Sequence, residues 1–201
     1  DAEIFGYFNR EEKIPAFKQS ILTSLPMRYG ENPHQKGTFY GNLEEVFTQL
    51  QGKKLSYNNL VDVDAAINLI GEFTKPAVAI IKHTNPCGIA SRQSLKEAYL
   101  GALACDPVSA FGGIIIANGT IQMDTAEELD KLFFEILIAD EYENDALERL
   151  KSKKNRIILQ KNSFVFSQRQ FKSILNGVLE QEKDLISEQE VDFQYITDMK
   201  P

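Results

Sequence analysis

Tryptophan is absent from the 201-residue chain, and cysteine, histidine and methionine are scarce, with two, two and three copies. Two cysteines cannot build a disulfide scaffold, so a reducing compartment, the cytoplasm, is expected. No apolar run approaches the roughly 18 residues of a membrane-spanning helix, and no secretory signal opens the chain. The first residue is Asp1 rather than Met, which predicts that the chain is part of a longer protein.

Positive charge is also in short supply. The 22 Lys and Arg residues are outnumbered by 29 Asp and Glu residues, and the formal net charge is −7. An acidic surface argues against binding to duplex nucleic acid, which requires a basic face. A pocket for a small anionic substrate needs only a few local cations, so that class of ligand stays open.

Helical segments alternate along the chain with short apolar strands, an order that predicts a layered α/β fold. Residues 1–27 are expected to be an irregular or helical lead-in. Helices are predicted over residues 43–50, 58–73, 94–104, 124–136 and 144–151. Strands are predicted at Ala77–Lys82, Ile114–Ala117, 156–160 and 163–166, with a turn at Asn176-Gly177 and an alternating stretch at 191–196.

The most suggestive chemistry lies where the strand Ala77–Lys82 runs into a polar loop, Lys82-His-Thr-Asn-Pro-Cys-Gly88. In α/β sheets, ligands gather at the carboxyl ends of strands. Lys82 could neutralise an anion or a developing oxyanion, and His83 could move a proton near neutral pH. A purely structural role is the alternative, in which Lys82 reaches solvent and His83 packs at the strand end.

A zinc site is a second hypothesis for the same loop, because His83 and Cys87 are four residues apart. Zinc needs three or four ligands with recognisable spacing. The chain has no Cys-x-x-Cys, and no His-x-Glu precedes Pro86-Cys87, so the zinc deaminase signature is incomplete. We therefore expect no metal, and we expect Cys87 and Cys105 to be small buried apolar residues.

Two further loops carry candidate binding groups. In the segment 28–35, Arg28 suits a phosphate and Tyr29 suits stacking on a base or donation of its hydroxyl, although a solvated turn would have the same composition. Gly112 and Gly113 precede a strand and would let the backbone approach a ligand, or would serve a turn and close packing.

Four long segments, in this order and spacing, carry a resemblance to a known family. They are Arg28-Tyr-Gly-Glu-Asn-Pro-His-Gln35, Leu55-Ser-Tyr-Asn-Asn-Leu60 with Asp64-Ala-Ala66, Lys82-His-Thr-Asn-Pro-Cys-Gly88 and Cys105-Asp-Pro-Val-Ser-Ala-Phe-Gly-Gly113. Together they resemble the AICAR transformylase domain of the bifunctional PurH family of purine biosynthesis, where AICAR is 5-aminoimidazole-4-carboxamide ribonucleotide. The resemblance continues through residues 153–155 and 177–184, so it covers most of the chain.

The resemblance implies a fold and a reaction. The family's transformylase domain contains two cytidine-deaminase-like subdomains, each a layered α/β unit with a mixed sheet flanked by helices and no catalytic zinc. Residues 1–201 resemble the first subdomain, with 1–27 as a lead-in from an IMP cyclohydrolase domain that the chain lacks, as it lacks the second subdomain. The implied reaction transfers a formyl group from the cosubstrate 10-formyltetrahydrofolate to AICAR, without a metal.

The resemblance also implies roles for single residues. Lys82 and His83 match the family's catalytic pair, Lys82 also as a substrate contact, and Arg28 and Tyr29 match its AICAR-contacting pair. Three residues are expected to support the loops, namely Asn85, Gly112 and Gly113. Asn176 is expected to contact the substrate, at a position where the family usually has glycine. A homodimer is implied, without nucleic acid or membrane partners. The alternatives are a fragment that binds AICAR without catalysis and a zinc deaminase-like hydrolase.

Overall fold

The computed structural model describes residues 1–10 and 16–186, and the chain divides into two compact units. Residues 20–164 form the larger unit, and residues 1–19 with 165–201 form the smaller one. The smaller unit contains a short helix, α1 (Ala2–Phe8), and an antiparallel hairpin of β11 (Arg169–Ile174) and β12 (Gly177–Glu182). The alternating stretch at 191–196 lies outside the described residues.

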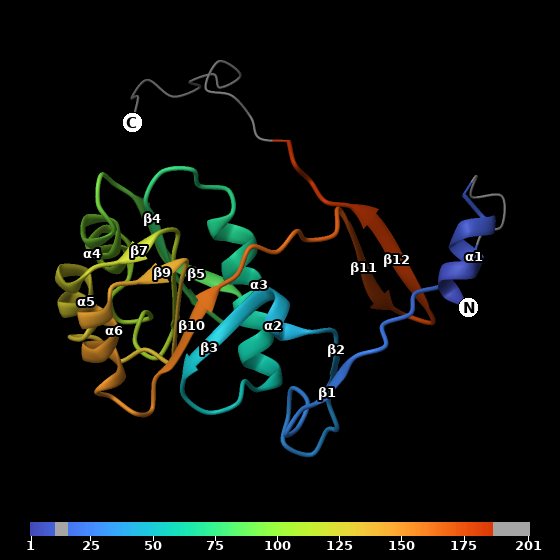
Figure 1. Cartoon of the computed structure of the whole chain (residues 1–201), viewed down its shortest axis with the longest axis horizontal. Helices are drawn as coiled ribbons and strands as arrows, with labels where there is room; N and C mark the ends of the chain where they lie inside the picture. The colour runs from blue at the N-terminus through green and yellow to red at the C-terminus, as the bar shows by residue number, and fades with distance from the viewer. Residues whose placement is uncertain (11–15, 187–201) are drawn as a thin grey trace. The chain divides into compact units, whose positions relative to one another are not determined.

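A six-stranded mixed sheet forms the centre of the larger unit (Figure 1). Its strands, in spatial order, are β3 (Phe47–Gln51), β10 (Ile157–Lys161), β8 (Ile136–Ala139), β6 (Ile114–Ala117), β4 (Ala77–Lys82) and β5 (Asn85–Ser91). The three middle strands β10, β8 and β6 are parallel, whereas β3, β4 and β5 pair antiparallel to their neighbours. The middle strands are short apolar runs buried on both faces, as is usual for parallel strands under helices.

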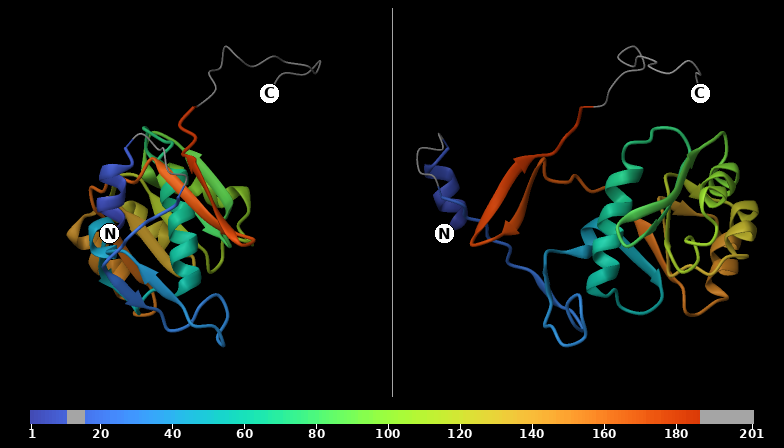
Figure 2. Two further views of the ribbon diagram at one scale, coloured as in Figure 1. Left: turned by 90° about the vertical axis from the view of Figure 1, so that its right-hand side faces the viewer. Right: turned by 180° about the vertical axis from the view of Figure 1, so that it is seen from behind.

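Helices cover both faces of this sheet, so the unit has three layers (Figures 1 and 2). One face packs against α3 (Tyr57–Ile70) and the other against α4 (Leu95–Cys105), α5 (Met123–Leu129) and α6 (Asn144–Lys151). Alternation along β4 divides its side chains, because Val78 and Ile80 join the α4–α6 core while Ala79 and Ile81 join the α3 core. The predicted layered α/β fold is confirmed.

The helices that border the site begin at residues with capping side chains. Ser56 accepts a hydrogen bond from the backbone amide of Asn59, and the Asn59 side chain accepts one from the backbone of Ser56, which completes a capping box for α3. Asn42 caps the four-residue helix α2 (Leu43–Val46) through Glu44. The predicted start of this helix, at residue 58, lies one residue from the observed start of α3 at Tyr57.

Smaller strand pairs complete the larger unit. An antiparallel hairpin joins β1 (Ser24–Pro26) to β2 (Thr38–Tyr40), and a parallel pair joins β7 (Thr120–Ile121) to β9 (Glu141–Tyr142). Among the described residues, no helix has the length and apolar character needed to cross a bilayer.

Three predicted helices are too long. The helix predicted at 58–73 ends at Ile70, since Gly71 is its C-cap residue. The segment 43–50 is helical only in α2, because the chain enters β3 at Phe47 and pairs there with β10, and this distant partner overrides local propensity. The segment 124–136 is helical only in α5, and β8 begins at Ile136. The apolar run before and within β8 fits a buried helix and a buried strand equally well, so periodicity does not distinguish them.

Two predicted loop and strand assignments also change. Residues 163–166 form no strand, since the chain leaves β10 at Asn162, whose side-chain amide donates to the carbonyl of Glu44 at 2.7 Å. The segment 83–88 is not a six-residue turn, because only His83 and Thr84 turn and β5 starts at Asn85.

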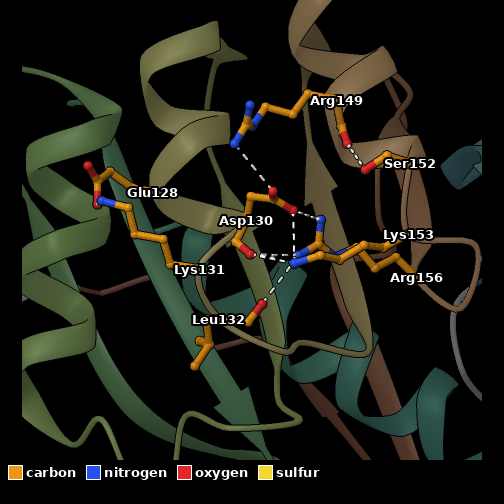
Figure 3. A network of polar contacts seen from close by, with 8 residues as sticks. All are labelled: Glu128, Asp130, Lys131, Leu132, Arg149, Ser152, Lys153 and Arg156. Carbon is orange, nitrogen blue, oxygen red and sulfur yellow. Dashed lines mark hydrogen bonds and ion pairs between the residues drawn. The ribbon is translucent and has the colours of Figure 1, made fainter.

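A network of charges ties the end of α5 to the start of β10 (Figure 3). The Asp130 carboxylate lies 2.8 Å from Arg156 Nη1, 3.1 Å from Lys153 Nζ and 3.4 Å from Arg149 Nη2. The Arg156 side chain is only 2% exposed, and its guanidinium carbon lies 4.3 Å from the centre of the Phe134 ring. Asp130 therefore neutralises a charge that is otherwise enclosed by apolar groups.

This network makes stability depend on acid pH. Burial raises the pKa of Asp130, but hydrogen bonds from Lys153 and Arg156 outweigh burial and hold that pKa below its ordinary value of 3.8. A carboxylate with a lowered folded-state pKa stabilises the protein above its unfolded-state pKa, and this stabilisation is lost as pH falls through the folded-state value. We expect the stability difference between the wild type and Asp130→Asn to shrink below about pH 4.

Denaturant unfolding of both proteins between pH 3 and 7 measures that difference. A difference that stays constant across this range would mean that the Asp130 charge contributes nothing to folding.

Candidate functional site

A cleft of about 1340 Å³ opens at one edge of the central sheet, and it is lined by segments from across the larger unit. Its walls come from the β1 strand and the loop after it, from α2 and β3, and from the loop that leads into α3. Its floor contains the end of β4 at Lys82, the start of β6 at Ile114 and the residue that precedes β8, Glu135. The candidate residues Arg28, Tyr29, Lys82, His83, Gly112 and Gly113 all line it.

The position of this cleft departs from the simplest rule for α/β sheets. Because β4 is antiparallel to β6, the carboxyl end of β4 lies beside the amino ends of β6 and β8. Ligands of all-parallel sheets bind at the carboxyl ends of the strands, and here only β4 satisfies that rule. Lys82 and His83 lie at the carboxyl end of β4, as the rule predicts, whereas the parallel strands β6 and β8 have their amino ends at the cleft.

Lys82 links the end of β4 to the loop that precedes β6. Its ammonium donates a hydrogen bond to the carbonyl of Phe111 at 2.9 Å, and the side chain is half-buried. An ammonium has three donors, so this bond holds the group in place and leaves further donors for a ligand in the cleft. Lys82 is thus oriented by the protein as a cation at the cleft floor.

His83 is exposed and lines the cleft from a tight turn between β4 and β5. The turn has positive φ at two successive residues, His83 at 52° and Thr84 at 63°. Two bonds form within the turn, from the Thr84 hydroxyl and the Asn85 amide group, both to the His83 carbonyl at 2.7 Å. The Asn85 side chain therefore bonds within the turn that contains His83, and its role in a functional site stays a prediction.

The Arg28–Tyr29 wall is attached to α3 through a neighbouring residue. The side-chain amide of Asn58 donates to the carbonyl of Glu31 at 3.2 Å, which connects the 28–37 loop to the first turn of α3. The Arg28 guanidinium lies 5.7 Å from the centre of the Tyr29 ring, so the two side chains lie next to each other. Asn59 caps α3, and Asn58 has this separate role that sequence analysis missed.

Glycine is required at both positions 112 and 113, by the backbone conformation at the first and by close packing at the second. Gly112 has a φ of +75°, and its amide donates to the carbonyl of Phe133 at 2.8 Å. A Cβ on Gly113 would lie 2.9 Å from the carbonyl oxygen of Ile81, too close for any other residue. The predicted turn and close packing are present, and the same backbone also forms part of the cleft.

Charged residues that sequence analysis did not single out complete the cleft. Lys53 and Glu135 form an ion pair at 3.1 Å, and Asp62 lines the cleft from α3. Four Lys or Arg side chains and three Asp or Glu side chains line the cleft, in a chain whose net charge is −7. Sequence analysis did not find Glu135 because it assigned this residue to a helix. A strand predicted to start at Ile136 would have placed Glu135 at the same end of the sheet as Lys82.

Asn176 belongs to the smaller unit, in the turn between β11 and β12. The positive φ of that turn falls on Leu175, at 50°, rather than on Asn176. Its role as a substrate contact stays a prediction.

The cysteines depart from their predicted burial. Cys105 is exposed, and Cys87 is half-buried, because α4 ends at Cys105 on the surface. Burial is the main cause that raises the pKa of the Cys87 thiol, and a protonated thiol is a poor metal ligand. Across residues 1–10 and 16–186, no group of three or more His, Cys, Asp or Glu side chains is arranged to hold a metal ion.

The fold and the cleft define a layered α/β unit with a charge-lined cleft at one edge of its sheet. A family model described as AICARFT/IMPCHase bienzyme matches residues 1–201, and the chain belongs to this family. The chain is 51% identical over 201 residues to the bifunctional purine biosynthesis protein PurH of Bacteroides thetaiotaomicron. It is 47% identical over 209 residues to PurH of a Thermoanaerobacter species, and 41% identical over 218 residues to PurH of Caldicellulosiruptor bescii.

These alignments cover the whole chain but only part of each relative. The chain spans 39% of the Bacteroides protein, 41% of the Thermoanaerobacter protein and 42% of the Caldicellulosiruptor protein. It therefore corresponds to about two fifths of the length of the curated relatives that it matches.

Proposed function

We propose that this chain supplies the AICAR-binding half of a formyltransferase site in IMP biosynthesis. The observation that carries the proposal is the joint placement of Lys82 and His83 at the floor of a cleft whose wall holds Arg28 and Tyr29. Membership of a family described as AICARFT/IMPCHase bienzyme supports the substrate. The formyl donor is 10-formyltetrahydrofolate, a cosubstrate.

The reaction explains why this site needs both a base and a cation. The 5-amino group of AICAR is conjugated to a carboxamide, so it is a weak nucleophile that must lose a proton as it attacks the formyl carbon. A carbon–nitrogen bond forms to AICAR, the carbonyl becomes a tetrahedral oxyanion, and the bond from that carbon to N10 of the folate then breaks. The proton that leaves AICAR is delivered in turn to N10 of the departing tetrahydrofolate.

We assign the proton transfer to His83 and the stabilisation of charge to Lys82. An imidazole changes its protonation near neutral pH, so it can accept and return a proton within one turnover. The Lys82 ammonium is already held by Phe111, so it requires little reorganisation as negative charge develops beside it.

Arg28 and Tyr29 are proposed to bind the nucleotide. The guanidinium suits the phosphate or carboxamide, and the phenol ring suits the base or ribose. Arg28 is exposed, so it is available to a ligand that enters the cleft.

Replacement of Arg28 tests this role. We expect Arg28→Ala to raise the KM for AICAR about 10- to 100-fold with kcat little changed, because hydrogen bonds to charged groups contribute about 1.5–3 kcal/mol. Lys36→Ala is the matched control, since Lys36 is an exposed cation of the same loop outside the cleft lining. An unchanged KM in Arg28→Ala contradicts the assignment.

The remaining parts of the active protein are also proposals. We propose that a second transformylase subdomain supplies folate contacts, that a cyclohydrolase domain closes the product to IMP, and that the protein works as a cytoplasmic homodimer. The lengths of the curated relatives, of which this chain spans about two fifths, support the presence of further domains.

Formyl transfer is tested in a full-length PurH protein that contains this chain, beside its Lys82→Ala variant. Turnover of AICAR with 10-formyltetrahydrofolate that is lost in the variant supports the proposal, and the absence of turnover in the parent protein refutes it. Calorimetric titration of the 201-residue chain with AICAR separates catalysis from binding. Saturable binding without turnover identifies the isolated chain as a nucleotide-binding half-site.

A further inference from the structure

The turn that contains His83 has a backbone conformation that its two residues, His83 and Thr84, disfavour. Two-residue hairpin turns with positive φ at both positions strongly prefer Asn-Gly or similar pairs. Here the residues are His83 and Thr84, at φ values of 52° and 63°. Thr84 is β-branched, a class for which positive φ is a true outlier. Such backbone persists only where surrounding contacts enforce it, and it clusters at functional sites.

A contact from another element holds this turn. The backbone amide of Thr84 donates a hydrogen bond to Asp62 Oδ1 at 2.7 Å. Asp62 lies in the second turn of α3 and is half-buried, whereas the bonds to the His83 carbonyl are made within the turn itself. A bond from an amide to an ionised carboxylate is shorter and stronger than one between neutral groups.

We propose that Asp62 is a positioning residue for His83. Its carboxylate holds the Thr84 amide and so keeps both turn residues in the left-handed conformation from which His83 lines the cleft. The catalytic consequence rests on the proposed formyl transfer, while the structural link between Asp62 and the turn does not. Without the carboxylate, Thr84 returns to negative φ and His83 moves away from the reacting amine.

Amide hydrogen exchange at Thr84 tests the structural link in the 201-residue chain. We expect Asp62→Ala to speed exchange at Thr84 about 10- to 100-fold, and Asp62→Asn to retain most of the protection because an amide oxygen also accepts a hydrogen bond. Asp64→Ala is the matched control, an exposed carboxylate two positions along the same helix. Unchanged exchange at Thr84 in Asp62→Ala overturns the proposal.

Kinetics in a full-length PurH protein that contains this chain test the positioning role. We expect Asp62→Ala to lower kcat about 10- to 100-fold, as small misplacements of catalytic groups do, while the KM for AICAR changes less than about threefold. A loss confined to KM overturns the proposal, because it would make Asp62 a direct substrate contact.

Substitution of Thr84 separates positioning from general destabilisation. Glycine adopts positive φ without steric cost, so the double variant Asp62→Ala with Thr84→Gly is expected to recover most of the lost kcat. Global loss of stability would not be repaired in this way, and failure of the double variant to recover contradicts the proposal. If the parent protein transfers no formyl group, the proposed function fails, and the exchange rates at Thr84 still decide whether Asp62 holds the turn.

Discussion

His83→Ala is expected to lower kcat for formyl transfer about 10²- to 10⁴-fold in a full-length PurH protein that contains this chain, the range typical of a lost general acid–base group. AICAR binding should change little, because we propose that Arg28 and Tyr29 of the cleft wall, rather than His83, bind the nucleotide. The physical reason is the weak amine of AICAR, which cannot complete its attack on the formyl carbon while it retains its proton. Steady-state kinetics with both substrates varied separate the two effects.

The chain provides its own control for this experiment. It has two histidines, and His34 is an exposed residue of the 28–37 loop that does not line the cleft. His34→Ala should keep kcat within about twofold of the wild type, the scale of an ordinary surface substitution. A wild-type kcat in His83→Ala would show that the proton takes another route.

Asp130→Ala is expected to destabilise the larger unit by about 3–5 kcal/mol, because it leaves the buried Arg156 guanidinium without the carboxylate that neutralises it. Arg156 is 2% exposed, and its remaining polar contacts are longer bonds to the carbonyls of Asp130 and Leu132, at 3.4 and 3.3 Å. Native domains are stable by only about 5–15 kcal/mol, so this loss is a large share of the total. Denaturant unfolding at pH 7 measures it.

A neighbouring ion pair serves as the control. Lys131 and Glu128 pair at 2.6 Å on the surface of the same region, and the Lys131 side chain is 69% exposed (Figure 3). Surface pairs of this kind contribute about 0–1 kcal/mol, so Lys131→Ala should change stability little. Equal losses of stability in Asp130→Ala and Lys131→Ala would mean that the burial of Arg156 does not determine how much stability is lost.

Sequence reasoning works where local rules decide the structure. The strands Ala77–Lys82 and Ile114–Ala117 are predicted to the residue because apolar runs mark their ends, and the helix Asn144–Lys151 is also predicted to the residue. Each of these elements is indicated by the pattern of its own residues, without information about distant segments.

The failures have a different cause, which is pairing between distant segments. Phe47 belongs to a strand only because β10 lies beside it, and Ile136 only because β6 and β8 run parallel. Glu135 and Asp62 reach the cleft through such long-range packing, so no local signal marks them. Asn58 likewise gains its role from a loop that precedes it by 27 positions.

The pairing of β3 with β10 also sets the order in which the cleft can be completed. Thr48 and Asn162 share a hydrogen bond although they are 114 positions apart, and Phe47 and Thr48 of β3 form part of the cleft wall. Contacts of such long range form slowly because a long loop must close first. During synthesis the segment 47–51 therefore emerges early and stays without its neighbour until residue 161 has been made. The cleft is thus among the last features of this unit that can be completed, whereas the β4–β5 hairpin that contains His83 pairs segments only a few positions apart.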